Sequence, residues 1–358
     1  MRERALDFTC QAQPMRVLFR SGAVPDAVPD AVALLALCRV LVLCDDHGLD
    51  TARAVAASLG DACADLHAGA VTHVPVEVAD LAVEAAREAR ADGCVAVGGG
   101  SVTGLAKAVA LRTGLPIVAV PTTYAGSGMT PVWGLTEGAV KRTGRDPKVV
   151  PRSVVYDPLL TLTMPPVGCD QRHERDRARS PALYAPDCTP IVSLMPEEGV
   201  RAPAAALPEI VADPSGHDAR SRALYGAWLC GACLGATSTG LHHKLCHVLG
   251  GTFDLPHAET HAVVLPHVPV CNAPAVPEAP AALRRALDVP DPVRELHEPG
   301  EQLGIPRSLA DLGPTAAGVD RAVDVALGAP YANPRPASAD DLRAVLHAAW
   351  AGEPPYGG

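Results

Sequence analysis

Histidines gather in one short segment of the chain. Six of the thirteen lie within 26 residues, at His242, His243, His247, His257, His261 and His267. His243 and His247 are four residues apart, so a helix would present both on one face. Converging imidazoles suit a divalent metal such as iron or zinc, or proton transfer to a developing enolate. A single histidine is more often structural, and a metal would normally want a carboxylate or a further imidazole to complete its shell.

A run of three glycines and a serine marks a second place where a ligand could bind. Gly98-Gly99-Gly100-Ser101 directly follows the apolar run Cys94–Val97 and precedes the helix-like stretch Val102–Leu111. Glycines let a backbone approach a pyrophosphate closely, and the next helix offers free N–H groups and the positive end of its dipole. A tight turn would explain three glycines about as well, so the motif alone is weak evidence for a dinucleotide.

Polar residues follow two further apolar runs in the same way. Thr122 and Thr123 come after Ile117–Val120, where their hydroxyls could hold ribose or phosphate. Asp45 follows Val40–Cys44. A carboxylate there can accept hydrogen bonds from ribose hydroxyls and would repel a 2′-phosphate, which favours NADH over NADPH. A helix cap or a loop acid is an equally good explanation of Asp45.

Two kinds of periodicity divide the chain. As far as about residue 160, short apolar runs alternate with Ala-rich helical stretches, which is the pattern of a parallel sheet covered by helices. The expected strands are Val40–Cys44, Cys94–Val97, Ile117–Val120 and Val154–Tyr156, and the expected helices between them include Leu49–Leu59 and Val78–Ala91. Later stretches are helix-like throughout, at Ile191–Leu207, Ala219–Leu249, Pro280–Leu287, Val319–Leu327 and Ala339–Ala351. We expect an α/β nucleotide-binding domain over residues 1–157 and an all-α domain over 158–358 that carries the histidines.

Composition narrows the partners and the compartment. The 358 residues include 30 Lys+Arg and 40 Asp+Glu, a net charge of −10, so we expect no nucleic-acid partner. An anionic small substrate needs only a local cationic pocket. Eleven scattered cysteines favour a reducing cytoplasm, and Met1–Cys10 lacks the apolar segment of a signal peptide. The apolar run Ala223–Leu241, with Cys230 and Cys233, predicts a buried helix rather than a membrane span or a thiol switch.

Longer segments resemble maleylacetate reductases, a group within the iron-containing alcohol dehydrogenase family. The similar segments are 98–107, 121–127, 141–146, 241–247, 250–257 and 333–336, and the similarity extends over nearly all of residues 7–350. The resemblance implies a dehydroquinate synthase-like architecture, with an active site in the cleft between a dinucleotide domain and a helical domain. It also implies a homodimer that reduces maleylacetate to 3-oxoadipate with NADH or NADPH, late in the degradation of aromatic compounds.

The same resemblance assigns roles to individual residues. Two metal-ligand histidines of the family lie fourteen residues apart, as His243 and His257 do here. His247 matches a histidine near the nicotinamide and is the expected proton donor. Ser127, in the segment 121–127, joins the glycines and threonines as an expected nucleotide contact.

The expected substrate is a dianion that accepts hydride. Hydride would add to the alkene carbon β to the ketone, and a metal or protonated imidazoles would stabilise the charge on the ketone oxygen. Three cations could clamp the carboxylates, although each could equally be a solvated surface charge; they are Lys244, Lys141 and Arg142.

One stretch departs from the family. After residue 168, related chains have a helix that reads about T-S-G-M-N-A-I-A-H-A-V-E-A-L-Y, whose Asn takes the place of a metal-ligand Asp and whose His is a further ligand. Here residues 169–180 read C-D-Q-R-H-E-R-D-R-A-R-S, and seven of the ten residues 170–179 are charged. We interpret the stretch as a local frameshift in the gene, which leaves the metal shell incomplete. His173 lies outside the matching register and is not a substitute ligand.

Two alternatives stay open at this point. A metal-dependent alcohol or glycerol dehydrogenase could use the same scaffold. A chain that has lost the family helix could instead bind nucleotide without turnover, as a pseudoenzyme. Assays of maleylacetate against simple alcohols separate the first alternative, and nucleotide titration beside a steady-state assay separates the second.

Overall fold

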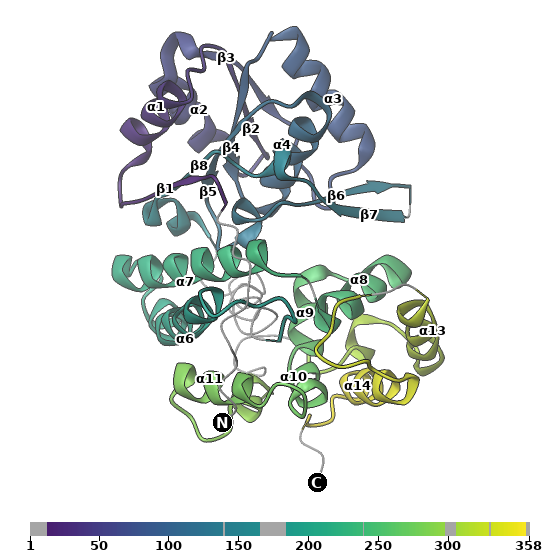
Figure 1. Cartoon of the computed structure of the whole chain (residues 1–358). Helices are drawn as coiled ribbons and strands as arrows, with labels where there is room; N and C mark the ends of the chain where they lie inside the picture. Colours follow the sequence, from purple (N-terminus) through teal and green to yellow (C-terminus); the bar gives the residue numbers. More distant parts are fainter. Residues whose placement is uncertain are drawn as a thin grey trace.

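The structure, a computed structural model, describes residues 13–138, 140–164, 184–238, 240–297, 306–328 and 331–355. The charged stretch 169–180 that departs from the family lies outside these ranges. The described residues form a sheet-bearing part that is followed along the chain by a helical part, and Figure 1 shows the helical part packed beneath the sheet.

A six-stranded parallel sheet forms the centre of the first part. Its order is β1-β8-β5-β4-β2-β3, with strands β1 (Arg16–Phe19), β8 (Ser153–Tyr156), β5 (Ile117–Pro121), β4 (Gly93–Gly98), β2 (Val40–Cys44) and β3 (Cys63–Ala68). Every residue of β2, β4 and β5 is buried, as expected of parallel strands that are covered on both faces. The predicted α/β class and the four predicted strands are confirmed.

Helices cover both faces of this sheet. Val40 and Val42 of β2 pack into the cluster that includes α1 (Val24–Leu34) and α2 (Leu49–Leu59). Leu41 and Leu43 pack on the other face, into the cluster that includes α3 (Val76–Glu88) and α4 (Gly100–Thr113). The remaining elements of this part are the antiparallel hairpin of β6 (Val132–Glu137) and β7 (Val140–Arg145), and the short 3-10 helices η1 (Gly60–Ala62), η2 (Gly126–Met129), η3 (Pro147–Val149) and η4 (Pro158–Thr163).

The second part contains only helices among its described residues. They are η5 (Val192–Leu194), α6 (Met195–Ala212), α7 (His217–Ala236), α8 (Leu241–Phe253), α9 (His257–Val264), α10 (His267–Asn272), α11 (Glu278–Leu287), α12 (Pro292–His297), η7 (Ala310–Leu312), α13 (Ala316–Leu327) and α14 (Ala339–Ala351). The stretch 219–249, predicted to be helical throughout, is two helices that are separated near Thr237–Gly240. Cys230 and Cys233 both lie inside α7, as predicted. Across the described ranges, no helix is long and apolar enough to span a bilayer.

The two parts meet where η2 and β7 contact α7. A Cβ on Gly231 of α7 would lie 2.8 Å from the carbonyl oxygen of Gly126, so only glycine allows the backbones to approach this closely. Arg145 of β7 donates hydrogen bonds to the carbonyl oxygens of Thr237 (2.9 Å) and Gly235 (2.7 Å) at the end of α7. The loop after β5 and the hairpin are therefore fixed to the helical part.

Candidate active site

Three neighbouring strands end in the residues that the sequence predicts as nucleotide contacts. Asp45, Gly98 and Thr122 lie at or directly after the carboxyl ends of β2, β4 and β5, which are adjacent in the sheet. The chain continues from β2 to β3 on one side and then returns to β4 on the other side. Ligands of parallel sheets bind at such a switch point, outside the carboxyl ends of the strands.

The glycine run fits this edge for steric reasons. Gly98 has φ +156°, and a Cβ there would lie 2.4 Å from Cγ2 of Val102. A Cβ on Gly99 would lie 3.1 Å from Cγ2 of Thr123 on the neighbouring strand end. Gly99 is the N-cap of α4, and no side chain caps this helix, so the first N–H groups of Gly100 and Ser101 point out of a bare helix N-terminus. We refer to Gly98–Ser101, which carry this positive helix end at the edge of the sheet, as the cradle.

A buried hydroxyl lies next to the cradle. The backbone N–H of Thr122 donates to the carbonyl oxygen of Gly98 (3.2 Å) and so joins the ends of β5 and β4. Ser127 follows in η2, and its Oγ is buried without a hydrogen-bond partner among the described residues. A Cβ on Gly100 would lie 3.9 Å from this oxygen. A buried hydroxyl without a partner costs free energy, which a ligand atom in the cradle would recover.

Asp45 has a structural role as well as a position at the switch point. Its Oδ1 accepts a hydrogen bond from the backbone N–H of Gly48 (2.7 Å), so the explanation as a loop acid holds for that oxygen. A Cβ on Gly48 would lie 3.5 Å from the carbonyl oxygen of Val97 in β4, which shows that this loop packs against the cradle strand. The half-buried carboxylate therefore stands beside the glycine run.

Four imidazoles meet where α8 packs against α9. The ring centroids of His242 and His261 are 4.8 Å apart, those of His243 and His261 are 5.3 Å apart, and those of His242 and His243 are 5.5 Å apart. His247 lies one turn further along α8, with its ring 6.1 Å from that of His243. His242, His243 and His261 are buried, whereas His247 is half-buried and so is the member of the group with the most access to solvent.

Of the other two clustered histidines, the structure describes the ring of His267 alone. His257 begins α9, and its side chain lies outside the described part of the structure. The described ring contact of His267 is with His297, at 6.3 Å between centroids. Burial, together with the charge of His297, lowers the pKa of His267 to about 4, so this imidazole is neutral at physiological pH. The sequence grouped His267 with the other histidines by proximity along the chain, whereas its described ring contact is with His297, outside this group.

The three predicted substrate cations occupy different environments. Arg142 pairs with Glu137 across the hairpin (2.8 Å), and its side chain is 69% exposed, so it behaves as a solvated surface charge. Lys141 is exposed on β7 and lies near His73. Burial and the charge of Lys141 lower the pKa of His73, whereas the charge of Asp254, just after α8, raises it. Lys244 lies half-buried on α8 between His243 and His247 in sequence. Lys244 is therefore the best placed of the three.

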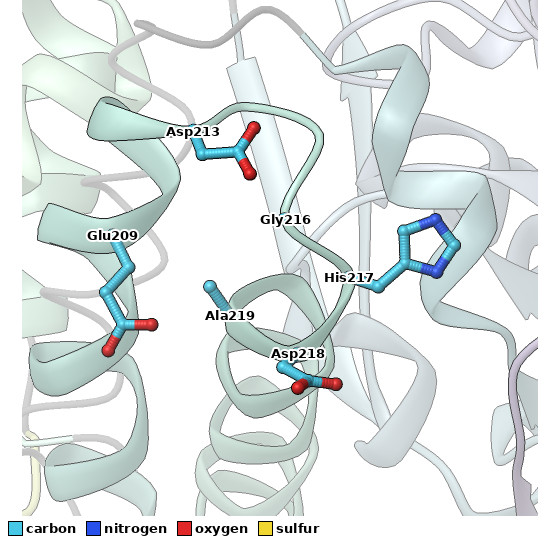
Figure 2. Close-up of a pocket in the computed structure, with 6 residues that line it drawn as sticks. All are labelled: Glu209, Asp213, Gly216, His217, Asp218 and Ala219. Carbon is cyan, nitrogen blue, oxygen red and sulfur yellow. The ribbon is translucent and has the colours of Figure 1, made fainter.

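A surface pocket lies elsewhere, at the turn between α6 and α7. It has a volume of about 280 Å³ and is lined by Glu209, Asp213, Gly216, His217, Asp218 and Ala219. Figure 2 shows that His217 points away from Glu209 and Asp213. Glu209 pairs with Arg222, and Asp213 accepts hydrogen bonds from Ser215. Its acidic lining suits neither a pyrophosphate nor a dianion, and it lies roughly 20 Å along α7 from Gly231.

Comparisons with known proteins identify the family. Residues 14–158 match the family model for iron-containing alcohol dehydrogenases, and residues 181–350 match the model for the C-terminal part of the Fe-containing alcohol dehydrogenase family. The chain belongs to the iron-containing alcohol dehydrogenase family. Neither family model covers residues 159–180, which include the departing stretch.

Relatives within the iron-containing alcohol dehydrogenase family are similar over their whole length. A maleylacetate reductase of Sphingobium indicum is 49% identical over 98% of this chain and 99% of its own. The crystal structure of maleylacetate reductase from Agrobacterium tumefaciens is 44% identical and superposes with a TM-score of 0.91, covering 98% of this chain and 99% of that one. The crystal structure of the Rhizobium sp. enzyme of the same name is 44% identical, with a TM-score of 0.90 over 98% of this chain and 100% of that one.

The described residues at the carboxyl edge of the sheet fit a nucleotide. The cradle at Gly98–Ser101 and the buried hydroxyl of Ser127 suit a dinucleotide phosphate group. Of the expected metal ligands, only His243 has a described side chain, because the side chain of His257 and residues 165–183 lie outside the described set. Sequence reasoning missed the contact of His242 with His261, because no local spacing indicates how α8 packs against α9.

Proposed function

We propose that this chain is a maleylacetate reductase, an oxidoreductase that reduces maleylacetate to 3-oxoadipate with a reduced nicotinamide nucleotide. The observation that carries the proposal is identity of 44–49% along the entire chain with proteins of that name. The glycine cradle on the sheet and the imidazoles on α8 support it, because hydride donation and enolate stabilisation require these two kinds of site. Residues 1–157 would bind the nucleotide, residues 158–358 would supply the imidazoles, and the active unit would be a cytoplasmic homodimer.

The nucleotide would lie along the carboxyl ends of β2, β4 and β5. When bound, the nicotinamide supplies the hydride that adds to the alkene carbon β to the ketone. Gly98, Gly99, Gly100 and Ser101 would hold the pyrophosphate at the N-terminus of α4. Thr122, Thr123 and Ser127 would donate hydroxyl groups to phosphate or ribose oxygens. Asp45 would accept from the ribose hydroxyls, and its negative charge favours NADH.

The imidazoles would stabilise the negative charge that forms on the substrate and would donate a proton to it. Negative charge builds on the ketone oxygen as the hydride arrives, and a donor that is already oriented stabilises it at little reorganisation cost. His243, which its neighbours hold in place, would donate a hydrogen bond to that oxygen. His247 has access to solvent and would deliver the proton. A metal on His243 and His257 stays a prediction, and no step described here depends on it.

Lys244 would bind a carboxylate of the dianion. It lies one residue from His243 and three from His247 on α8, and it is half-buried. Lys141, which is exposed on β7, could bind the second carboxylate. Arg142 contributes less, because Glu137 already neutralises it.

A substrate comparison tests this function. Purified protein is assayed for loss of NADH absorbance with maleylacetate, and separately for NADH formation from simple alcohols and glycerol. We expect maleylacetate-dependent oxidation of NADH with 3-oxoadipate as product, and slow or no oxidation of the alcohols. Faster turnover of alcohols would make the chain an alcohol dehydrogenase on the same scaffold. Nucleotide binding in a titration, without turnover of any of these substrates, would make it a pseudoenzyme.

A further inference from the structure

Three buried side chains that could bind a metal lie next to His243, to which the proposed reaction assigns a role. His242 and Cys246 are four residues apart on one face of α8, and His261 faces them from α9. All three are buried, with exposed fractions of 3%, 1% and 0% respectively. Nε2 of His242 lies 3.0 Å from Nδ1 of His261 and 3.9 Å from Sγ of Cys246, and the three donor atoms lie within 4.8 Å of one another.

We propose that His242, Cys246 and His261 bind a zinc-like divalent metal ion between α8 and α9. This donor set differs from the His243 and His257 pair that the family resemblance implies, and the proposal does not depend on the substrate assigned above. Two imidazoles and one thiolate are ligands that zinc accepts in tetrahedral sites. The fourth position would remain open to a water molecule or another donor.

The spacing of the donor atoms matches such a site. Zinc–nitrogen bonds of about 2.0–2.1 Å and zinc–sulfur bonds of about 2.3 Å place tetrahedral N···N and N···S edges at about 3.4 Å and about 3.6 Å. The two observed edges from Nε2 of His242, 3.0 Å and 3.9 Å, each differ from these values by a few tenths of an ångström, and the third edge, between His261 and Cys246, is at most 4.8 Å. Rotation of the imidazole rings and of the Cys246 side chain would bring the three atoms towards bonding distance.

The surroundings favour a structural ion. Cys246 belongs to an apolar cluster with Leu241, Leu245, Val263 and Val264, so the donors lie in a medium where polar groups need partners. Binding converts the Cys246 thiol to a thiolate, which releases one proton per ion and leaves one positive charge in the site. The two ring hydrogens move to the nitrogens that do not face the metal. The ion would clamp α8 to α9 and so orient His243, whose ring contacts both His242 and His261.

Cobalt titration tests the site without reference to turnover. Full-length protein is stripped with a chelator, dialysed and titrated with Co²⁺, a spectroscopic substitute for zinc. We expect one tightly bound ion per chain, a thiolate-to-cobalt charge-transfer band in the near ultraviolet, tetrahedral ligand-field bands in the visible, and release of one proton. Thermal melting should shift upward with the metal, because only the folded chain presents the three donors together.

Variants assign the ligands. C246S should abolish the charge-transfer band, whereas C233S, a control at a buried cysteine in α7, should leave it unchanged. H242N and H261N should each weaken Co²⁺ binding at least tenfold, and H257A should leave binding intact. Loss of binding in H257A together with its retention in C246S would overturn the proposal in favour of the family's site, as would an absence of tight binding in the wild-type chain.

A second measurement covers the case in which the ligand variants fail to fold. X-ray absorption at the zinc edge of the wild-type protein counts the scatterers around the ion directly. One sulfur together with two or three nitrogen or oxygen neighbours supports the proposal. A shell of nitrogen and oxygen alone refutes it.

Discussion

Buried polar groups show where single residues have a specific task. Lys107 of α4 is fully buried, and its ammonium group donates to the carbonyl oxygens of Thr130 (2.7 Å) and Val132 (2.7 Å) and to Oγ1 of Thr130 (3.0 Å). It thereby ties the cradle helix to the segment that follows η2. Burial, together with the charge of Arg145, lowers the pKa of Lys107 to about 7. At the edge of the cradle, Asp45 accepts a hydrogen bond from the Gly48 N–H through one oxygen, and its negative charge can distinguish NADH from NADPH.

Asp45 gives a prediction about nucleotide choice. D45N keeps an oxygen that can accept from Gly48 N–H but removes the negative charge, so the repulsion of a 2′-phosphate should fall. The ratio of kcat/KM for NADPH to that for NADH should rise about tenfold, which corresponds to ~1.4 kcal/mol. D46N, at the exposed neighbouring residue, serves as the matched control. Equal ratios in the two variants would show that Asp45 does not face the ribose.

Lys107 gives a prediction about pH. Its pKa in the folded chain lies below the value of about 10.4 in an unfolded chain, so between about pH 7 and pH 10 the unfolded state binds more protons. The free energy of unfolding should therefore rise with pH in this window, by up to about 1.4 kcal/mol per pH unit, and should be insensitive to Lys107 below it.

Urea unfolding of the wild-type chain and K107M at several pH values measures this contribution. The difference between the two proteins removes the effects of thiols that titrate in the same range. The slope should be smaller in K107M than in the wild type. Parallel pH profiles would mean that Lys107 stays protonated inside the protein.

At the scale of elements, the strands with buried residues on both faces were predictable and the edge strands were not. β2, β4, β5 and β8 are apolar runs, because both faces of the sheet cover them. β1 has no fully buried residue and begins with the exposed Arg16, and β3 carries Asp65 and His67; both are edge strands, which need less apolar sequence. The break between α7 and α8 was also missed, because a continuous run of apolar and small residues does not indicate where one helix ends and the next begins.

The nucleotide side of the candidate site was predictable from the sequence, whereas the contacts among the histidines were not. The glycine run and the threonines follow strands directly, so local sequence placed them at one edge of the sheet. The partner of His242 was not predictable, because it depends on how α8 crosses α9. Contacts between η2 and α7 likewise depend on packing, and Gly126 and Gly231 carry no local signal of it.

The contact of η2 with α7 gives a prediction at this scale. In G231A the added Cβ would lie 2.8 Å from the carbonyl oxygen of Gly126 and 3.2 Å from Cβ of Met129, so η2 must move away from α7. We expect a loss of about 1–3 kcal/mol in the free energy of unfolding and weaker nucleotide binding, because Ser127 moves with η2.

The matched control is G251A in α8, where an added Cβ meets nothing within 4 Å. It should be neutral, or more stable by about 0.5–1 kcal/mol, because alanine favours a helix. Thermal or urea unfolding and nucleotide titration give both readouts. Similar behaviour of the two variants would mean that the junction is not tightly packed.

At the scale of the whole molecule, the departing stretch separates two well-matched halves. The family models end at residue 158 and resume at residue 181. The family resemblance implies a helix with metal ligands in this interval, whereas here seven of ten consecutive residues are charged. Charges of that density cannot be buried without partners. The codons of the gene around positions 168–183 test the frameshift directly: codons that cannot spell the family helix in a shifted frame would refute it.

Exchange of this stretch predicts a gain of function. Replacement of residues 169–180 by the aligned segment of the Sphingobium indicum relative should raise kcat/KM for maleylacetate at least about tenfold and raise the Tm, because an inward-facing helix would replace a charged segment. A Gly/Ser segment of equal length is the control and should restore neither property. Unchanged kinetics after the exchange would show that the chain works as it stands.

Arg145 has a mechanical consequence for this two-part architecture. Its guanidinium group is bound to two carbonyl oxygens at the negative end of the α7 dipole. Any change of angle between the halves must extract the guanidinium group, because β6 is itself fixed to the first half by the hydrogen bonds of Lys107 to Val132 and of Thr136 to His73 and Val74. The single Arg145 side chain therefore resists relative motion of the two halves.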